Sequence, residues 1–194
     1  MPRRKSFEPE IALEKAQSLF WELGYDATSI SALEKRMGIN RFSIYETFGD
    51  KKALFLQCLE AYSQDMKAGN LALLRDPGGL DGIRQFLTRM VDGPPAARRR
   101  GCFMMNSLVE ISGRDADVSR IVDTHFRLVE RSLRRAVDEA KSRGEVAPGV
   151  ATVDAARTLL ALAHGALSLG KSEFGRPVAR TAIQTVLNQL TGED

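Results

Sequence analysis

The sequence predicts an all-α fold, because apolar residues recur at intervals of three and four along most of the chain and no segment alternates like a half-buried strand. Glycine, proline and capping residues divide these periodic stretches into short helices near the N-terminus and longer ones beyond. With 43% hydrophobic and 27% charged residues, the composition is that of an ordinary globular protein. A chain of 194 residues suits a small module joined to a larger helical core.

The N-terminal module contains three predicted helices, over residues 11–23, 30–37 and 41–48. Gly24 and Gly38 end the first two helices, as glycine commonly does. Thr28 and Ser29 are possible caps of the second helix, and Asn40 caps the third, since short polar side chains accept the free N–H groups of a first turn. We therefore expect three short helices before the chain breaks at residues 49–50.

In the rest of the chain, the spacing of apolar residues and the glycine and proline breaks predict longer helices, over residues 51–76, 80–92, 102–112, 118–143, 153–169 and 179–190. The basic run Arg98-Arg99-Arg100 is expected to be a loop between two of them. The opposite, charged face of the 118–143 helix includes Arg131, Arg134 and Arg135, which we interpret as a solvated surface. The 153–169 helix is apolar nearly all round, so it is expected to be buried on more than one side.

Charge and cysteine content narrow the functional classes. The net charge is only +3, from 28 basic and 25 acidic residues, so individual residues and not bulk charge must carry any case for nucleic-acid binding. Cys58 and Cys102 form neither a disulfide framework nor a metal-ligating spacing, and no cofactor or metal is expected. This use of cysteine fits a reducing cytoplasm, and neither a signal peptide nor a membrane-spanning helix is expected.

Residues 29–48 have the length and the tight turn of a helix-turn-helix, with Gly38-Ile39-Asn40 as the turn. In such a unit the second helix enters the major groove and its N-terminal side chains meet base edges. Arg41 can then donate to guanine, Phe42 can contact a thymine methyl, and Ser43 can bond a base or a phosphate.

Neighbouring residues can hold the DNA backbone. Tyr45 suits a phosphate, and Lys51 adds a positive charge at a helix start where free N–H groups already favour an anion. Arg3 and Arg4 belong to a basic arm that can follow the backbone or enter the minor groove. The complete set of candidate DNA-binding residues is Arg3, Arg4, Thr28, Ser29, Asn40, Arg41, Phe42, Ser43, Tyr45 and Lys51.

These residues lie within a pattern that resembles the N-terminal signature of TetR-family transcription regulators, over about fifty residues. The matching residues are Gly24-Tyr25-Asp26-Ala27-Thr28-Ser29-Ile30, Gly38-Ile39-Asn40, Tyr45, Phe48, Lys51 and Leu54. The family commonly has an Ile-Ala pair where this chain has Leu33-Glu34, and a small residue or proline where it has Phe42. Glu34 is therefore expected to point outward or to find a partner.

The resemblance implies a domain organisation and a function. It places a helix-turn-helix DNA-binding domain in residues 1–52 and a helical ligand-binding and dimerisation domain in residues 53–194. It implies a homodimer that pairs through its last two helices, binds a palindromic operator in double-stranded DNA and acts as a repressor until a small-molecule effector binds.

The effector cavity implied by the resemblance has apolar and polar candidate residues, namely Phe86, Met90, Cys102, Phe103, Asn106, His125, Phe126 and His164. Cys102 follows the basic run and begins a predicted helix, and both features favour a reactive thiolate. Each candidate also has a plainer interpretation, because apolar residues, cysteines and lone histidines at helical spacing are commonly part of a core.

Two other functional classes compete with the DNA-binding hypothesis. In an enzyme, Cys102 and either His125 or His164 could act as nucleophile and base. The chain lacks phosphate-loop, HExxH, GxSxG and paired-carboxylate patterns, so no catalytic residue is expected. A helical protein–protein adaptor is the alternative, with its last helices binding a partner. That alternative leaves Arg41, Tyr45 and Lys51 without a role.

Overall fold

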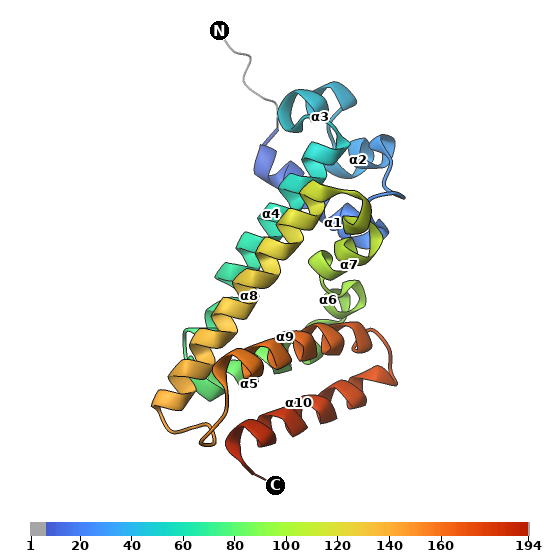
Figure 1. The fold of residues 1–194 in the computed structure, drawn as a ribbon. Helices are drawn as coiled ribbons and strands as arrows, with labels where there is room; N and C mark the ends of the chain where they lie inside the picture. Colours follow the sequence, from blue (N-terminus) through green and yellow to red (C-terminus); the bar gives the residue numbers. More distant parts are fainter. Residues whose placement is uncertain (1–6, 194) are drawn as a thin grey trace. The chain divides into compact units, whose positions relative to one another are not determined.

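The fold is all-α, as expected, in a computed structural model that describes residues 7–193 (Figure 1). Its helices are α1 (Pro9–Leu23), α2 (Ile30–Met37), α3 (Arg41–Phe48), α4 (Lys51–Ala68), α5 (Gly79–Asp92), α6 (Pro95–Arg100), α7 (Phe103–Glu110), α8 (Ala116–Ser142), α9 (Thr152–Leu169) and α10 (Gly175–Thr191). Short 3₁₀ helices, η1 (Asn70–Leu74) and η2 (Ser112–Arg114), follow α4 and α7. Within residues 7–193 there is no strand, and no helix is long and apolar enough to cross a membrane.

The chain divides into two compact units. The first combines the residues up to Gln64 with Phe103–Val122, and the second combines Asp65–Cys102 with the residues from Asp123 onward. The first unit thus contains α1, α2, α3 and α7, and the second contains α5, α6, α9 and α10. Helices α4 and α8 each contribute to both units.

An aromatic cluster forms the core of the first unit. Phe55 of α4 lies edge-on to Phe20 and to Phe103, with ring centroids 5.0 and 5.7 Å apart. The Trp21 and Tyr62 rings each lie within 6.0 Å of Phe103, and the Tyr25 ring lies 4.8 Å from Phe55. Rings at these distances and angles attract each other beyond the area that they bury. The cluster therefore fixes α1 and α4 against the start of α7.

The second unit has a separate core, in which α5, α8, α9 and α10 bury their apolar faces. Its fully or nearly buried side chains include Leu87, Leu133, Leu159 and Leu187, one from each helix. Glu145 accepts a hydrogen bond from the backbone N–H of Leu80 at 2.8 Å, which joins the end of α8 to the start of α5. Figure 1 shows α9 and α10 side by side in this unit.

Two expectations about helix boundaries are wrong. Arg98-Arg99-Arg100 is the last turn of α6 and not a loop, because Pro95 starts a helix readily and arginine is a good helix former. Helix α4 ends at Ala68, well before residue 76, and the chain continues as η1. Gly69 follows Ala68 directly, and glycine is poorly suited to a helix interior.

Candidate nucleic-acid interface and effector site

The α2–α3 pair is a closely connected helix-turn-helix. Ser29 caps α2 by accepting the N–H of Ala32 at 3.1 Å, and Asn40 caps α3 by accepting the N–H of Ser43 at 2.9 Å. Gly38 ends α2 with a φ of 76°, in the left-handed region that only glycine adopts without strain. The caps and the glycine confine the connection to Gly38, Ile39 and Asn40, so the start of α3 is held in one place.

Glu34 adds a contact across this turn. Its Oε1 accepts the backbone N–H of Arg41 at 2.6 Å, which satisfies one of the free N–H groups in the first turn of α3. Glu34 was expected to point outward or to find a partner, and its partner is the backbone N–H of Arg41. The carboxylate at this unusual position stabilises the turn in place of a small packing residue.

Helix α3 has a buried and an exposed face. Ile44 and Phe48 are buried in the first unit, while Phe42 is 73% exposed and Tyr45 is 43% exposed. Arg41 is also exposed, at the first position of the helix. The arrangement leaves the candidate base-contacting side chains of Arg41 and Phe42 available to a partner.

The remaining candidate DNA-binding residues before α3 differ in exposure and in their local role. Thr28 is buried and its hydroxyl donates to the carbonyl of Gly24 at 2.6 Å, so it closes the α1–α2 turn and is not a surface hydroxyl. Ser29 and Asn40 are exposed but serve as helix caps. Arg3 and Arg4 lie outside the described residues.

Lys51 and Lys52 at the start of α4 have different surroundings. The ammonium group of Lys51 lies 4.4 Å from the centroid of the Tyr25 ring, a cation–π geometry that leaves its charge available to an anion. Lys52 instead pairs with Asp115 and Asp117, at 2.9 and 2.8 Å. Hydrogen bonds from Lys52 lower the pKa of both carboxyls and raise the pKa of the ammonium group. Lys51 is therefore the residue of this pair that suits a phosphate.

A contact that the sequence does not reveal holds the turn between α1 and α2. Both carboxylate oxygens of Glu110, at the end of α7, accept backbone N–H groups of that turn, from Tyr25 at 3.0 Å and from Asp26 at 2.9 Å. Arg114 of η2 forms an ion pair with the Asp26 side chain. We call Glu110 and Arg114 the turn clamp. No local sequence pattern predicts the turn clamp, because the residues that it joins are 84 to 88 positions apart.

Gly24 makes room for the turn clamp. A side chain at this position would place its Cβ 2.7 Å from a carboxylate oxygen of Glu110, which is closer than real contacts allow. The residue also has a φ of 84°, which disfavours any side chain. The left-handed φ therefore favours glycine here, and a side chain would also have to displace the Glu110 carboxylate from the turn.

The candidate effector residues fall in both units. Phe103 belongs to the aromatic core of the first unit and is 2% exposed, so its packing accounts for it without a ligand. Asn106 lies half-buried on α7 of the same unit. In the second unit, Phe86 and Met90 are buried on α5 within its core.

Both buried histidines of the second unit contact the Phe126 ring. The Phe126 ring on α8 lies edge-on to His164 on α9, with centroids 4.8 Å apart, and is 5.9 Å from His125. Burial lowers the pKa of His164 to about 4, and burial together with the nearby His164 lowers that of His125 to about 4. Both rings are therefore neutral at pH 7. Both nitrogens of His164 are buried without a hydrogen-bond partner among the described residues, so this ring can supply the polar contact expected of an effector site.

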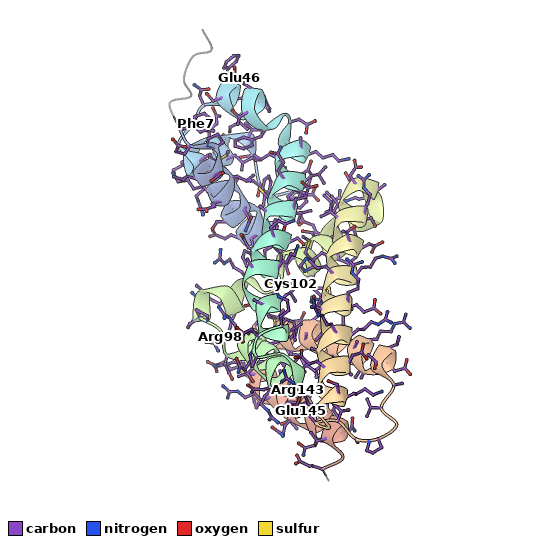
Figure 2. All side chains as sticks on the ribbon, turned by 90° about the vertical axis from the view of Figure 1, so that its left-hand side faces the viewer. Phe7, Glu46, Arg98, Cys102, Arg143 and Glu145 are labelled. Atoms are coloured by element: carbon purple, nitrogen blue, oxygen red, sulfur yellow. The ribbon has the colours of Figure 1, made fainter. Side chains whose placement is uncertain are left out.

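Cys102 lies just before α7 and is buried, at 4% exposed (Figure 2). Its burial is what the plainer interpretation of a small core side chain expects. Cys58 is also buried, and burial raises the pKa of its thiol. Across residues 7–193, no three histidine, cysteine or acidic side chains group in a way that could hold a metal ion.

Comparison with protein families gives two matches. Residues 12–58 match the model described as bacterial regulatory proteins, tetR family. Residues 79–186 match the model described as the tetracyclin repressor-like C-terminal domain. Together these matches include both helices of the helix-turn-helix and most of the second unit.

Relatives and solved structures agree with these matches. An uncharacterized HTH-type transcriptional regulator of Bacillus subtilis, YezE, is 30% identical over 148 residues, covering 75% of this chain and 76% of the relative. The Escherichia coli HTH-type transcriptional repressor ComR is 28% identical, covering 75% and 71%. A cysteine mutant of the TetR family regulator CifR, complexed with 26-bp operator DNA, has a TM-score of 0.82 at 22% identity, covering 97% of this chain and 99% of that chain.

The turn clamp predicts a local change in backbone protection. Replacing Glu110 with alanine removes the acceptor of the Tyr25 and Asp26 N–H groups, and a hydrogen bond to a charged acceptor contributes about 1.5–3 kcal/mol. We expect the amide hydrogens of these two residues to exchange at least about tenfold faster in the variant. Glu46→Ala, at an exposed position of α3 (Figure 2), is the control and should leave both rates unchanged. Equal rates in the wild type and Glu110→Ala would contradict the clamp.

The buried histidines predict a loss of stability in mild acid. Their pKa lies near 4 in the folded protein and near 6.5 in the unfolded chain, so the unfolded chain binds more protons as the pH falls from about 6.5 to about 4. Each ring should lower the free energy of unfolding by about 1.4 kcal/mol per pH unit in this window. Urea denaturation at pH 6.5 and 5 should show the wild type losing about 1.5 kcal/mol more than His164→Asn. Parallel pH profiles would rule out a neutral, buried His164.

Proposed function

Because this chain belongs to the TetR family of DNA-binding transcriptional regulators, we propose that it is a repressor that binds a palindromic operator through α2 and α3 and leaves it when an effector binds. The observation that carries the proposal is the exposed face of α3, where Arg41, Phe42 and Tyr45 lie together while Ile44 and Phe48 anchor the helix. The name of its relative ComR, a transcriptional repressor, supports repression.

The residues at the start of α3 and α4 suit different kinds of DNA contact. Arg41 suits a guanine edge, because its guanidinium can donate two parallel hydrogen bonds, and the Phe42 ring suits a thymine methyl. Ser43 can reach a base or a phosphate, while Tyr45 and Lys51 suit the phosphate backbone. In this proposal, residues 1–52 form the DNA-binding domain and act in the cytoplasm, where the operator is.

Dimerisation through α9 and α10 is supported by the surface that they leave uncovered. Leu169, Phe174 and Val178 are 43%, 81% and 41% exposed, and the small residues Ala161 and Gly165 are exposed on α9. Small residues let helices approach closely, and the large apolar residues would then be covered by the second subunit. A two-fold dimer presents two α3 helices to half-sites about 34 Å apart.

The effector is proposed to bind in residues 53–194, near the contact of Phe126 with His164. The unpartnered nitrogens of His164 support this site, since a ligand with one polar group among apolar atoms would satisfy them. Release of DNA then requires that the effector bind more tightly to a form of the dimer that does not fit the operator. We propose no catalytic role for Cys102, His125 or His164.

Operator binding by α3 predicts large losses from single substitutions. Arg41→Ala should weaken binding to the DNA flanking the protein's own gene by about tenfold or more, because a bidentate base contact contributes about 1–3 kcal/mol. Tyr45→Ala should weaken it by about tenfold, because it removes a hydrogen bond to a charged phosphate, which contributes about 1.5–3 kcal/mol. Lys51→Ala should also reduce the slope of affinity against salt concentration by about one. Fluorescence anisotropy with competitor DNA measures both quantities.

The control for this experiment is Arg131→Ala, because Arg131 is an exposed arginine on α8 outside the proposed interface. It should bind the operator like the wild type. If all four variants bind alike, α3 does not read DNA and the helical adaptor becomes the better account.

The dimer proposal predicts the molar mass in solution and predicts that one introduced carboxylate will halve it. Light scattering at micromolar concentration should give twice the 21.4 kDa chain mass, and Ala161→Glu should give a monomer because it buries a carboxylate in the apolar contact. Val109→Glu, at an apolar α7 position that is 82% exposed, should remain a dimer. A monomeric wild type would contradict dimerisation through α9 and α10.

A further inference from the structure

The second unit contains a small pocket with a basic wall, between α6 and the turn that joins α9 to α10. The charged side chains that line it are Arg98, Arg99, Lys171, Glu173 and Arg176. Four of these are cations and one is an anion. The pocket has a volume of about 90 Å³, which is roughly enough for a few waters or for one oxyanion of the size of phosphate. We call it the basic pocket.

The arginines of the basic pocket are not neutralised by the protein. Within the part of the chain that the structure describes, the side chains of Arg98, Arg99 and Arg176 make no ion pair or hydrogen bond. Elsewhere in the same unit Arg143 pairs with Glu139 and Arg180 pairs with Asp92. Uncompensated like charges that converge on one pocket repel each other, and an anion would remove that cost.

Arg98 carries the strongest indication of a missing partner. Its Nε is buried, with no hydrogen-bond acceptor among the described residues. A buried guanidinium N–H without an acceptor is costly, since it has lost its water without a replacement. Arg98 lies on α6 (Figure 2), whose Pro95 also lines the pocket.

The opposite wall is fitted closely to α6. The Lys171 side chain lies against the end of α6, since a Cβ at residue 101 would be 2.3 Å from its Cε. The hydroxyl of Ser172, also in this wall, accepts the N–H of Gly175 at 2.9 Å and orders the turn into α10. This hydrogen bond fixes the turn that carries Lys171 and Glu173.

We propose that the basic pocket binds an oxyanion, the phosphate or carboxylate group of a small metabolite, with Arg98 and Arg176 as its principal ligands. A planar guanidinium matches both groups because it donates two parallel hydrogen bonds to a pair of oxygens. Glu173 is exposed and does not occupy the arginines. This site differs from the proposed effector site at His164, and it does not depend on the DNA-binding proposal.

The test is thermal unfolding of the full chain without DNA, with inorganic phosphate and acetate titrated separately against chloride at constant ionic strength. A saturable rise in Tm of about 2–4 °C is expected with at least one of these anions, and the anion that produces it identifies the group. Arg98→Gln and Arg176→Gln should abolish the rise, while Arg131→Gln, outside the pocket, should keep it. A rise of equal size in all four proteins, or no rise in the wild type, would overturn the proposal.

Two further measurements separate the alternatives. Without added oxyanion, Arg98→Gln should unfold at the same or a higher temperature than the wild type, because it removes an uncompensated charge, whereas a merely structural arginine would lower it. Operator affinity in chloride should be unchanged in Arg98→Gln and Arg176→Gln. A lower affinity with a shallower salt dependence would assign the arginines to the DNA backbone and overturn the small-oxyanion site. The Arg41→Ala experiment tests DNA binding separately.

Discussion

The turn clamp of Glu110 and Arg114 is the contact on which the placement of the helix-turn-helix depends. Helix α2 follows directly from the turn at residues 24–29, and both backbone N–H groups that Glu110 accepts belong to that turn. The aromatic cluster holds α1 and α4 to the start of α7, and the clamp holds the end of α7 to the turn. A shift of α7 within the first unit would therefore move α2 and, through its capped connection, α3.

Few contacts are needed to hold α3 in place, and its exposed face remains available to a partner. Two buried residues, Ile44 and Phe48, and the Asn40 cap fix α3, so its other positions are available for contacts with a partner. Preorganised side chains lose less entropy on binding than mobile ones. Glu34 shows that a departure from the common family pattern can still serve the same end, because it secures the N–H of Arg41.

The second unit combines two chemistries that a regulator can use. His164 is neutral and buried beside the Phe126 ring, which suits a largely apolar ligand with one polar group. The basic pocket lies at the α9–α10 turn, and its three arginines make no ion pair within residues 7–193, which suits a small anion. Because α9 and α10 are the helices proposed to pair, an anion at their turn would act close to the dimer contact.

The sequence alone determined the features that depend on neighbours a few residues away. Helical spacing and caps predicted the bounds of α2 and α3 and the all-α fold, because a cap or a glycine acts within one turn of a helix. Local signals failed where several propensities compete, as at Arg98-Arg99-Arg100, and where exposure matters, as at Thr28. The turn clamp and the basic pocket were decided only by tertiary structure. Glu110 and Tyr25 are 85 positions apart, and no pattern within a helix turn can record which distant N–H groups a carboxylate will meet.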